Sequence, residues 1–184
     1  MQGLSSRRAE LSGDEGCIVS TCSTGALSVG CAGLVTGGNP DNLWKLPDLE
    51  GMKNEVIIPT YSWTAYESAV KGVGVKMVEV ANLEALRAAL STKTAMILVL
   101  AGEQSENGSL SIKAISSIVK PLNIPILVDA AAEGLVVPNP HLSQGADLVA
   151  YSGWKCLIGP QCSGLLLGRK GLVRAAWGPR PHIP

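Results

Sequence analysis

Residues 124–155, "IPILVDAAAEGLVVPNPHLSQGADLVAYSGWK", indicate the fold of this chain. They contain two short apolar runs, 124–129 and 146–152, and each run ends in polar residues. Apolar runs of this length are typical of strands that are buried on both faces. Connections long enough for a helix separate such runs along the chain, and this spacing predicts a parallel sheet covered by helices on both sides.

The rest of the chain follows the same alternation. Further strands are predicted at 17–21, 55–60, 75–80, 95–101 and 163–169, and helices at 25–35, 65–74, 82–91 and 112–122. Asn82 is a typical helix cap. The longest irregular connection, 37–54, is interpreted either as a functional loop or as a surface excursion. The predicted fold class is therefore α/β, a three-layer α-β-α arrangement with a mostly parallel sheet.

Size and composition exclude several classes of protein. The chain has 184 residues, enough for one α/β domain with a core, and its fifteen basic and fifteen acidic residues cancel. Phe is absent and aromatic residues make up 4% of the chain, which leaves little surface for stacking nucleic-acid bases. With no net charge and no basic stripe, tRNA is an unlikely partner.

The chain also lacks the patterns of membrane and secreted proteins. Its longest apolar stretch, 95–102, is far shorter than the roughly 20 residues that a bilayer requires. Two arginines near the start have no apolar region behind them, so we expect no secretory signal and a cytoplasmic protein.

The cysteines and histidines predict neither a disulfide framework nor a metal site. There are five cysteines, an odd number, without a CxxC pair, and the two histidines lie far apart in the sequence. We therefore expect the cysteines to be small buried hydrophobic residues in a reducing compartment.

Polar residues at strand ends are the candidates for function, because ligands of open α/β sheets bind beyond the carboxyl ends of the strands. Ser23 and Thr24 begin a small-residue helix, where they form either an anion site or an ordinary cap. Asp129 needs a partner such as a protonated ring nitrogen or a metal, unless it serves only the turn. Lys155 is either a nucleophile with a lowered pKa or a surface lysine.

In combination these residues are more specific than each is alone. A helix start suited to phosphate, then a strand-end aspartate, then a lysine about 25 residues later is the order used by pyridoxal-phosphate (PLP) enzymes of the aminotransferase fold. PLP offers a phosphate, a pyridine nitrogen and an aldehyde, which these three groups match in turn. The predicted cofactor is therefore pyridoxal 5'-phosphate.

Several segments also resemble a known family. "ELSGDEGCIVST", "LPDLEGMKNEVII", "PILVDAAAE" and "GPQCSGLLLGRK" are similar to the bacterial selenocysteine synthase (L-seryl-tRNA(Sec) selenium transferase) family and its short relatives such as D-glucosaminate-6-phosphate ammonia-lyase. The similarity runs from about residue 8 to residue 176. It implies a PLP-binding large domain at 1–176, incomplete at both ends relative to the family, and a short tail at 177–184.

The resemblance implies roles for individual residues. Lys155 corresponds to the lysine that forms the Schiff base and later removes the α-proton, and Asp129 to the partner of the pyridine nitrogen. Ala131 is expected near the ring face, and phosphate contacts are expected from Ser152, Ser23 and Thr24. The implied reaction is β-elimination or replacement on a small amino acid or amino sugar acid, catalysed by a homodimer.

The chain departs from the family at four positions. Cys22, Ser62, Trp154 and Ile158 stand where family members often carry Gly, a ring-stacking His, Gly and Arg, respectively. Trp63 and Tyr61 are the candidates for replacing the stacking His.

Two other interpretations remain open. The chain could be a catalytically inactive remnant of this fold that acts only in association. It could instead be a nucleotide-binding α/β domain, although it has no glycine fingerprint after its first strand.

Overall fold

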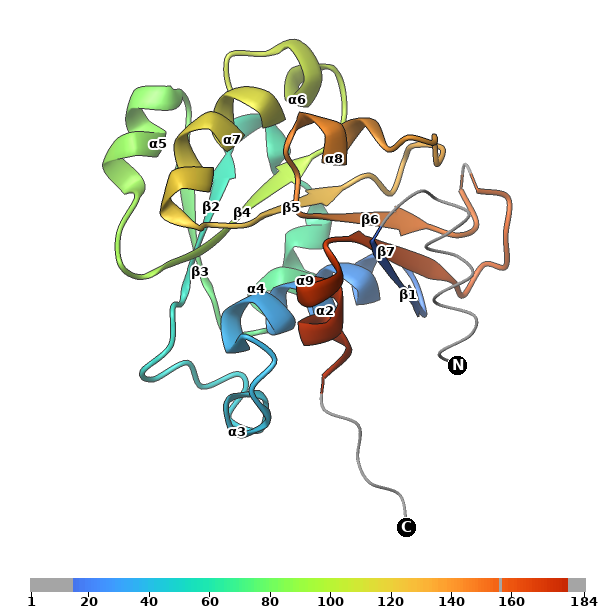
Figure 1. The fold of residues 1–184 in the computed structure, drawn as a ribbon, viewed down its shortest axis with the longest axis horizontal. Coiled ribbons are helices and arrows are strands. Elements are labelled where there is room, and N and C mark those ends of the chain that lie inside the picture. Colours follow the sequence, from blue (N-terminus) through green and yellow to red (C-terminus); the bar gives the residue numbers. More distant parts are fainter. Residues whose placement is uncertain (1–14, 156, 179–184) are drawn as a thin grey trace.

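The computed structural model describes residues 15–155 and 157–178, which form a seven-stranded sheet (Figure 1). The strand order is β1-β7-β6-β5-β4-β2-β3. The strands are β1 (Gly16–Ser20), β2 (Glu55–Pro59), β3 (Lys76–Val80), β4 (Thr94–Leu100), β5 (Ile126–Asp129), β6 (Leu148–Ser152) and β7 (Gly164–Gly168). Among the described strands only β7 is reversed, and it pairs antiparallel with both β1 and β6. The predicted mostly parallel α/β sheet is confirmed.

Helices cover both faces of the sheet, as the apolar strands predicted (Figure 1). One face carries α2 (Ser23–Thr36), α4 (Ser68–Lys71) and α9 (Lys170–Trp177). The opposite face carries α5 (Leu83–Ala89), α6 (Glu103–Asn107), α7 (Ile112–Val119) and α8 (Pro140–Gln144). Each layer has its own core, so a strand such as β4 contributes Ile97 to one core and Met96 to the other. Within the described residues no helix is both long and apolar enough to cross a bilayer.

The helix expected at 65–74 is shorter than predicted. The segment begins with a 3-10 turn, η2 (Ala65–Glu67), and only α4 is α-helical. The chain must turn sharply at Gly74, which has a φ of 104° and on which a Cβ would lie 2.0 Å from the Pro47 carbonyl oxygen. A helix cannot continue through that backbone conformation.

Short elements escaped prediction. These are α3 (Pro40–Leu43), α6, α8, α9 and the 3-10 turn η1 (Thr60–Ser62). The helix predicted at 112–122 is observed as α7 followed by the 3-10 turn η3 (Lys120–Leu122). Helices of four or five residues show less than two turns of periodicity, which is too little to identify them. The eight-residue α9 is stabilised by its contact with α2, since its Val173 is buried in the core that α2 also lines.

Residues 37–54 lie at the amino ends of the strands. The segment leads directly into β2, and the Asn54 N–H donates to the Lys93 carbonyl oxygen just before β4 begins. Ligand sites of such sheets lie at the opposite edge. Of the two interpretations of this connection, the structure favours the surface excursion.

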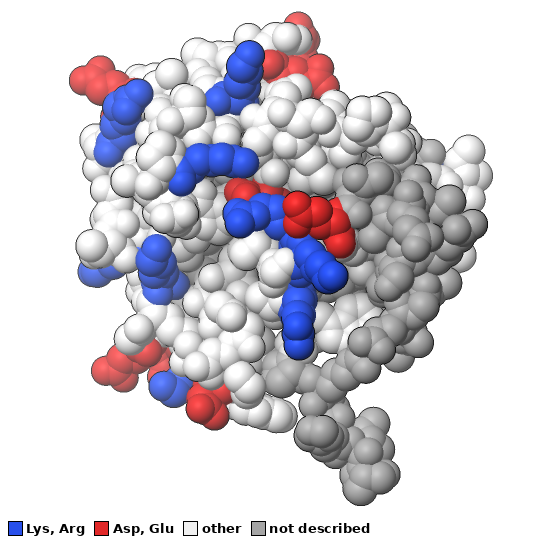
Figure 2. Space-filling view, in the orientation of Figure 1, with Lys and Arg blue, Asp and Glu red and all other residues white. Residues whose placement is uncertain are grey.

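Charged groups are spread over the surface. In Figure 2 Lys and Arg are interspersed with Asp and Glu over the described part of the visible face, with much uncharged surface between them. This arrangement agrees with the net charge of zero.

A buried carboxylate joins three strands at the amino edge of the sheet. Asp147 is 3% exposed in its side chain and accepts hydrogen bonds from the Ile126 N–H and from Arg169 Nη1, both at 2.9 Å. The Arg169 N–H also donates to the Asp147 carbonyl oxygen. Asp147 therefore links the start of β5, the start of β6 and the end of β7.

We predict that Asp147→Ala lowers the free energy of unfolding by about 2–4 kcal/mol, because it leaves the buried Ile126 N–H without an acceptor. Arg169→Met should cost less than Asp147→Ala, because Asp147 Oδ2 still accepts the Ile126 N–H and only the mostly exposed arginine partner is lost. Urea titration followed by circular dichroism measures both values. Equal losses in the two variants would contradict the role assigned to the Ile126 hydrogen bond.

Candidate active site

The candidate residues converge on one edge of the sheet. Because β1, β5 and β6 run in the same direction, their last residues, Ser20, Asp129 and Ser152, lie at the same edge. Ser152 and Ser20 both pair with Gly164, from opposite sides of β7. Two strand spacings place them about 10 Å apart.

Lys155 follows β6 in a tightly closed loop. The Gly153 N–H donates to the Ser163 carbonyl oxygen at 2.8 Å, and the Gly159 N–H donates to the Gly153 carbonyl oxygen at 2.6 Å. A Cβ on Gly153 would lie 1.9 Å from Ser163 Oγ, so only glycine allows this approach. The loop holds the half-buried Lys155 with its Nζ 5.7 Å from the centroid of the Tyr66 ring.

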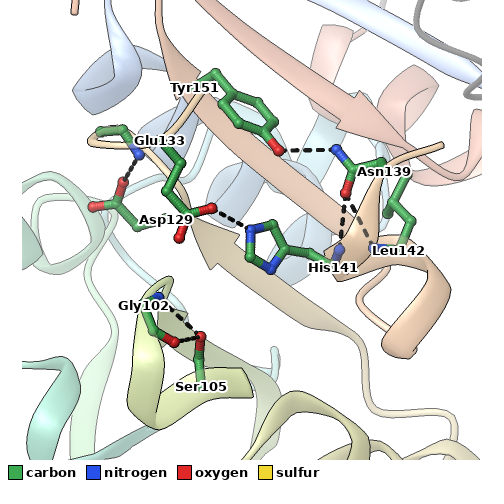
Figure 3. A network of polar contacts seen from close by, with 9 residues as sticks. Gly102, Ser105, Asp129, Glu133, Asn139, His141, Leu142 and Tyr151 are labelled. Atoms are coloured by element: carbon green, nitrogen blue, oxygen red, sulfur yellow. Dashed lines mark hydrogen bonds and ion pairs between the residues drawn. The ribbon is translucent and has the colours of Figure 1, made fainter. Parts of the chain in front are cut away.

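Asp129 is buried beside this lysine, with 8% of the residue exposed. Its Oδ1 accepts a hydrogen bond from the Ala131 N–H at 3.0 Å (Figure 3). Burial raises the pKa of the Asp129 carboxyl, while the Ala131 hydrogen bond and the positive charge of Lys155 lower it. The structure thus places the predicted lysine near enough for its charge to lower the pKa of the Asp129 carboxyl, and the roles of both residues stay predictions.

Glu67 is a second buried carboxylate that sequence reasoning missed. It is 5% exposed, and its negative charge acts on Asp129 to raise the pKa of that carboxyl further. Glu67 Oε1 accepts the Thr64 N–H in a capping box. The T-x-x-E spacing was visible in the sequence, but it indicates a helix start and says nothing of Asp129. The site thus contains two carboxyl groups and a single amine.

The predicted anion site lies where α2 begins, above the start of β7. Ser23 and Thr24 are the first residues of this 14-residue helix. A Cβ on Gly164 would lie 2.3 Å from the Cys22 carbonyl carbon and 2.7 Å from the Ser23 nitrogen. Glycine at this position lets the positive end of the helix rest on the sheet edge.

The thiol of Cys22 caps this helix. Its Sγ accepts the Gly25 N–H at 3.3 Å, and this bond is the main reason that the pKa of the Cys22 thiol is lowered. The expectation of buried cysteines is confirmed for Cys17 and Cys31, and burial raises the pKa of Cys31 to about 12. It is wrong for the partly exposed Cys22 and for the exposed Cys162, both of which lie outside the cores. Cys156 lies outside the described residues.

The two aromatic candidates for covering a cofactor ring pack elsewhere. The Tyr61 hydroxyl donates to the Leu110 carbonyl oxygen at 2.9 Å, and its ring packs against the core on the α7 side. Trp63 packs against the opposite core, with Lys71 Nζ 4.6 Å from its ring centroid. Tyr66 is instead the aromatic residue beside Lys155. No pattern in the sequence indicated that Tyr66 would lie beside a residue 89 positions later.

The remaining departures from the family differ in exposure. Ser62 is buried, and its Oγ accepts the Leu100 N–H at 3.0 Å, which ties the ends of β2 and β4 together. Trp154 and Ile158 are 52% and 89% exposed on the Lys155 loop.

The group of residues at this edge fits PLP. An amine, a pair of buried carboxylates with excess negative charge, and a helix N-terminus match an aldehyde, a protonated ring nitrogen and a phosphate. The backbone just after the neighbouring strand β4 is also unobstructed. Gly102 follows β4, whose continuation Ala101 donates its N–H to the Asp129 carbonyl oxygen, and a Cβ on Gly102 would meet no atom within 4 Å.

Comparison with known proteins identifies close relatives. D-glucosaminate-6-phosphate ammonia lyase from Salmonella typhimurium is 31% identical over 173 residues, which cover 89% of this chain and 46% of that protein. A solved structure of a D-glucosaminate-6-phosphate ammonia-lyase superposes with a TM-score of 0.84 at 30% identity and covers 96% of this chain and 51% of its own. This chain thus spans about half the length of the ammonia lyase.

A second relative confirms the other part of the resemblance. L-seryl-tRNA(Sec) selenium transferase from Proteus mirabilis is 38% identical over 72 residues, which cover 33% of this chain and 15% of that protein. The family model described as Cys/Met metabolism PLP-dependent enzyme matches residues 2–168. The predicted cofactor is the one on which this family depends. The chain belongs to the Cys/Met metabolism PLP-dependent enzyme family.

Proposed function

We propose that this chain is the cofactor-binding large domain, 1–176, of a PLP-dependent lyase or transferase. The observation that carries the proposal is the convergence of the buried Asp129, the loop of Lys155 and the start of α2 at one edge of the sheet. The proposed substrate is a small amino acid or amino sugar acid. The ammonia lyase supports this choice, since it is similar over most of this chain and its name specifies an amino sugar acid.

The residues at this edge have separate tasks in binding the cofactor. Ser23, Thr24 and Ser152 would hold the phosphate, assisted by the positive end of the α2 dipole. Asp129 would hold the proton on the ring nitrogen, because the two buried carboxyl groups have a single amine, that of Lys155, to offset their charge. Lys155 would bond to the aldehyde carbon. When bound, PLP supplies an electron-accepting ring that stabilises negative charge on the substrate α-carbon.

Lys155 would also act as the general base. Its Nζ would accept the proton that the substrate α-carbon loses, and the bound cofactor would stabilise the resulting negative charge while a β-substituent departs with its bonding electrons. The Tyr66 ring, whose centroid lies 5.7 Å from Nζ, would attract the protonated amine. Ala131, adjacent to the aspartate, would lie near the ring face. Whether ammonia release or a new donor completes the reaction depends on groups beyond these residues.

The proposal extends to partners and location. We propose that the protein is a cytoplasmic homodimer. We also propose that tRNA is not its substrate, because the net charge is zero and the charges in Figure 2 are interspersed.

We predict that borohydride reduction of the purified chain with PLP labels Lys155 at close to one equivalent. Peptide mapping by mass spectrometry gives the position. Lys155→Arg should abolish the label and keep the fold, whereas Lys170→Arg, on the exposed first residue of α9, should leave labelling unchanged. Labelling elsewhere, or none, would count against the proposal.

Activity separates this proposal from an inactive remnant of the fold. We expect turnover of an amino sugar acid or small amino acid, measured as ammonia or keto-acid release, to be lost in Lys155→Ala. Cofactor binding at Lys155 without turnover of any amino substrate, in the dimer, would favour the remnant. Nucleotide binding without PLP binding would favour the nucleotide-binding interpretation.

We predict that Asp129→Asn raises the melting temperature of the cofactor-free protein by a few degrees at pH 7. Because burial raises the folded-state pKa of Asp129, the folded protein binds this proton more tightly than the unfolded chain does. The stability of the natural protein therefore falls as pH rises from the ordinary aspartate pKa through the raised value. The advantage of Asp129→Asn should appear above that window and vanish below it. Equal melting temperatures at pH 7 would contradict the assigned burial cost.

A further inference from the structure

We infer that His141 is a positioning residue for the Asp129 carboxylate and acts through Glu133. The inference depends on the proposed function only for the role of Asp129 in binding the cofactor. The contacts among these residues are features of the structure itself. Figure 3 shows the residues involved, which come from the end of β5, the turn after it, the start of α8 and strand β6.

The turn after β5 holds one oxygen of Asp129. The Ala130 N–H continues the sheet by donating to the Ala150 carbonyl oxygen at 2.9 Å, and the Ala131 N–H then donates to Asp129 Oδ1. The Glu133 N–H closes the turn on the Ala130 carbonyl oxygen at 3.0 Å. The direction of the Asp129 side chain therefore depends on the conformation of residues 130–133.

This turn lies near the surface, and a side-chain contact fixes it to the interior. Ala132 is exposed, and the Glu133 side chain is 29% exposed. Glu133 Oε2 lies 2.6 Å from Nε2 of His141, a ring with no exposed surface. With a carboxylate as its partner, Nε2 carries the hydrogen and donates it. A short bond to a charged acceptor is among the stronger hydrogen bonds in proteins.

The burial of His141 is poorly explained by stability alone. Its other ring nitrogen, Nδ1, is buried without a hydrogen-bond partner among the described residues. Burying a polar nitrogen without a partner costs free energy, and an apolar side chain of similar size would avoid that cost. The hydrogen bond to Glu133 is the polar contact that an apolar side chain at this position could not make.

Hydrogen bonds of Asn139 fix the position of His141 relative to strand β6. Asn139 Oδ1 accepts the His141 N–H at 3.1 Å and the Leu142 N–H at 3.2 Å, and Asn139 Nδ2 donates to the Tyr151 hydroxyl at 2.9 Å. Tyr151 is fully buried on β6, the strand that leads to Lys155. The network thus connects the turn that bonds to Asp129 with the strand that precedes Lys155, and so fixes the positions of these two side chains relative to each other.

Hydrogen exchange of the cofactor-free protein tests the inference directly. In His141→Leu we expect the Ala131 amide to exchange about 10-fold faster or more, relative to the Val128 amide within β5, because the turn opens locally. In His141→Gln, whose side-chain N–H can still donate to Glu133, we expect the ratio to stay close to that of the natural chain. Amide exchange followed by NMR measures both.

Asp147→Ala is the matched control, since it destabilises the same strands at their opposite ends. It should change the exchange of Val128 and Ala131 together and leave their ratio unaltered. An unaltered ratio in His141→Leu would overturn the inference. Should His141→Leu not fold, Glu133→Ala and Glu133→Gln provide the same comparison from the other partner, with loosening expected in the first and not in the second.

Cofactor binding supplies the second measurement. Absorbance titration should show PLP affinity about 10-fold weaker in His141→Leu than in the natural chain and restored in His141→Gln. If the natural chain does not bind PLP at Lys155, the proposed function fails, and the exchange ratio still decides the role of His141. If PLP binds with equal affinity to both chains while the exchange ratio changes, His141 orders the turn without positioning the carboxylate, and the inference is overturned.

Discussion

The parallel pairing of β5 with β6 is the constraint on which the site depends. It sets Asp129 opposite Ala150, so the aspartate lies beside the strand whose next turn carries Lys155. A register shift of one residue would turn the Asp129 side chain to the other face of the sheet and away from the lysine. At the amino ends of the same strands, Asp147 accepts the Ile126 N–H and fixes this register. The site at one edge is therefore maintained by a buried carboxylate at the other.

The buried carboxyl groups of the site lower the stability of the folded protein. Asp129 and Glu67 are both buried, the charge of Glu67 raises the pKa of the Asp129 carboxyl, and Lys155 offers one positive charge to the two carboxylates. Buried groups whose pKa values are shifted by burial and by a specific partner are typical of functional sites. A cationic ligand atom at Asp129, such as the protonated ring nitrogen in the proposed function, would reduce this imbalance.

Membership of the family and details of the site come from different observations. The match over residues 2–168 assigns the family, while the chain spans about half of the ammonia lyase that it resembles. Within this half, the aromatic residue beside Lys155 is Tyr66, and a thiol caps the helix that faces the sheet edge. Both features lie at the edge of the sheet where the cofactor is proposed to bind.

Local patterns in the sequence determined the strands, the long helix α2 and the strand-end positions of Asp129 and Lys155. Each of these follows from the apolar periodicity or turn chemistry of a few consecutive residues, as with the Asn82 cap of α5. Tyr66, Glu67 and His141 could not be found in this way. Their surroundings come from segments that the fold brings together, such as η2 against the Lys155 loop. Only the tertiary structure decided which buried side chains surround the aspartate, because burial and electrostatic contact depend on distances in space that the order of residues does not specify.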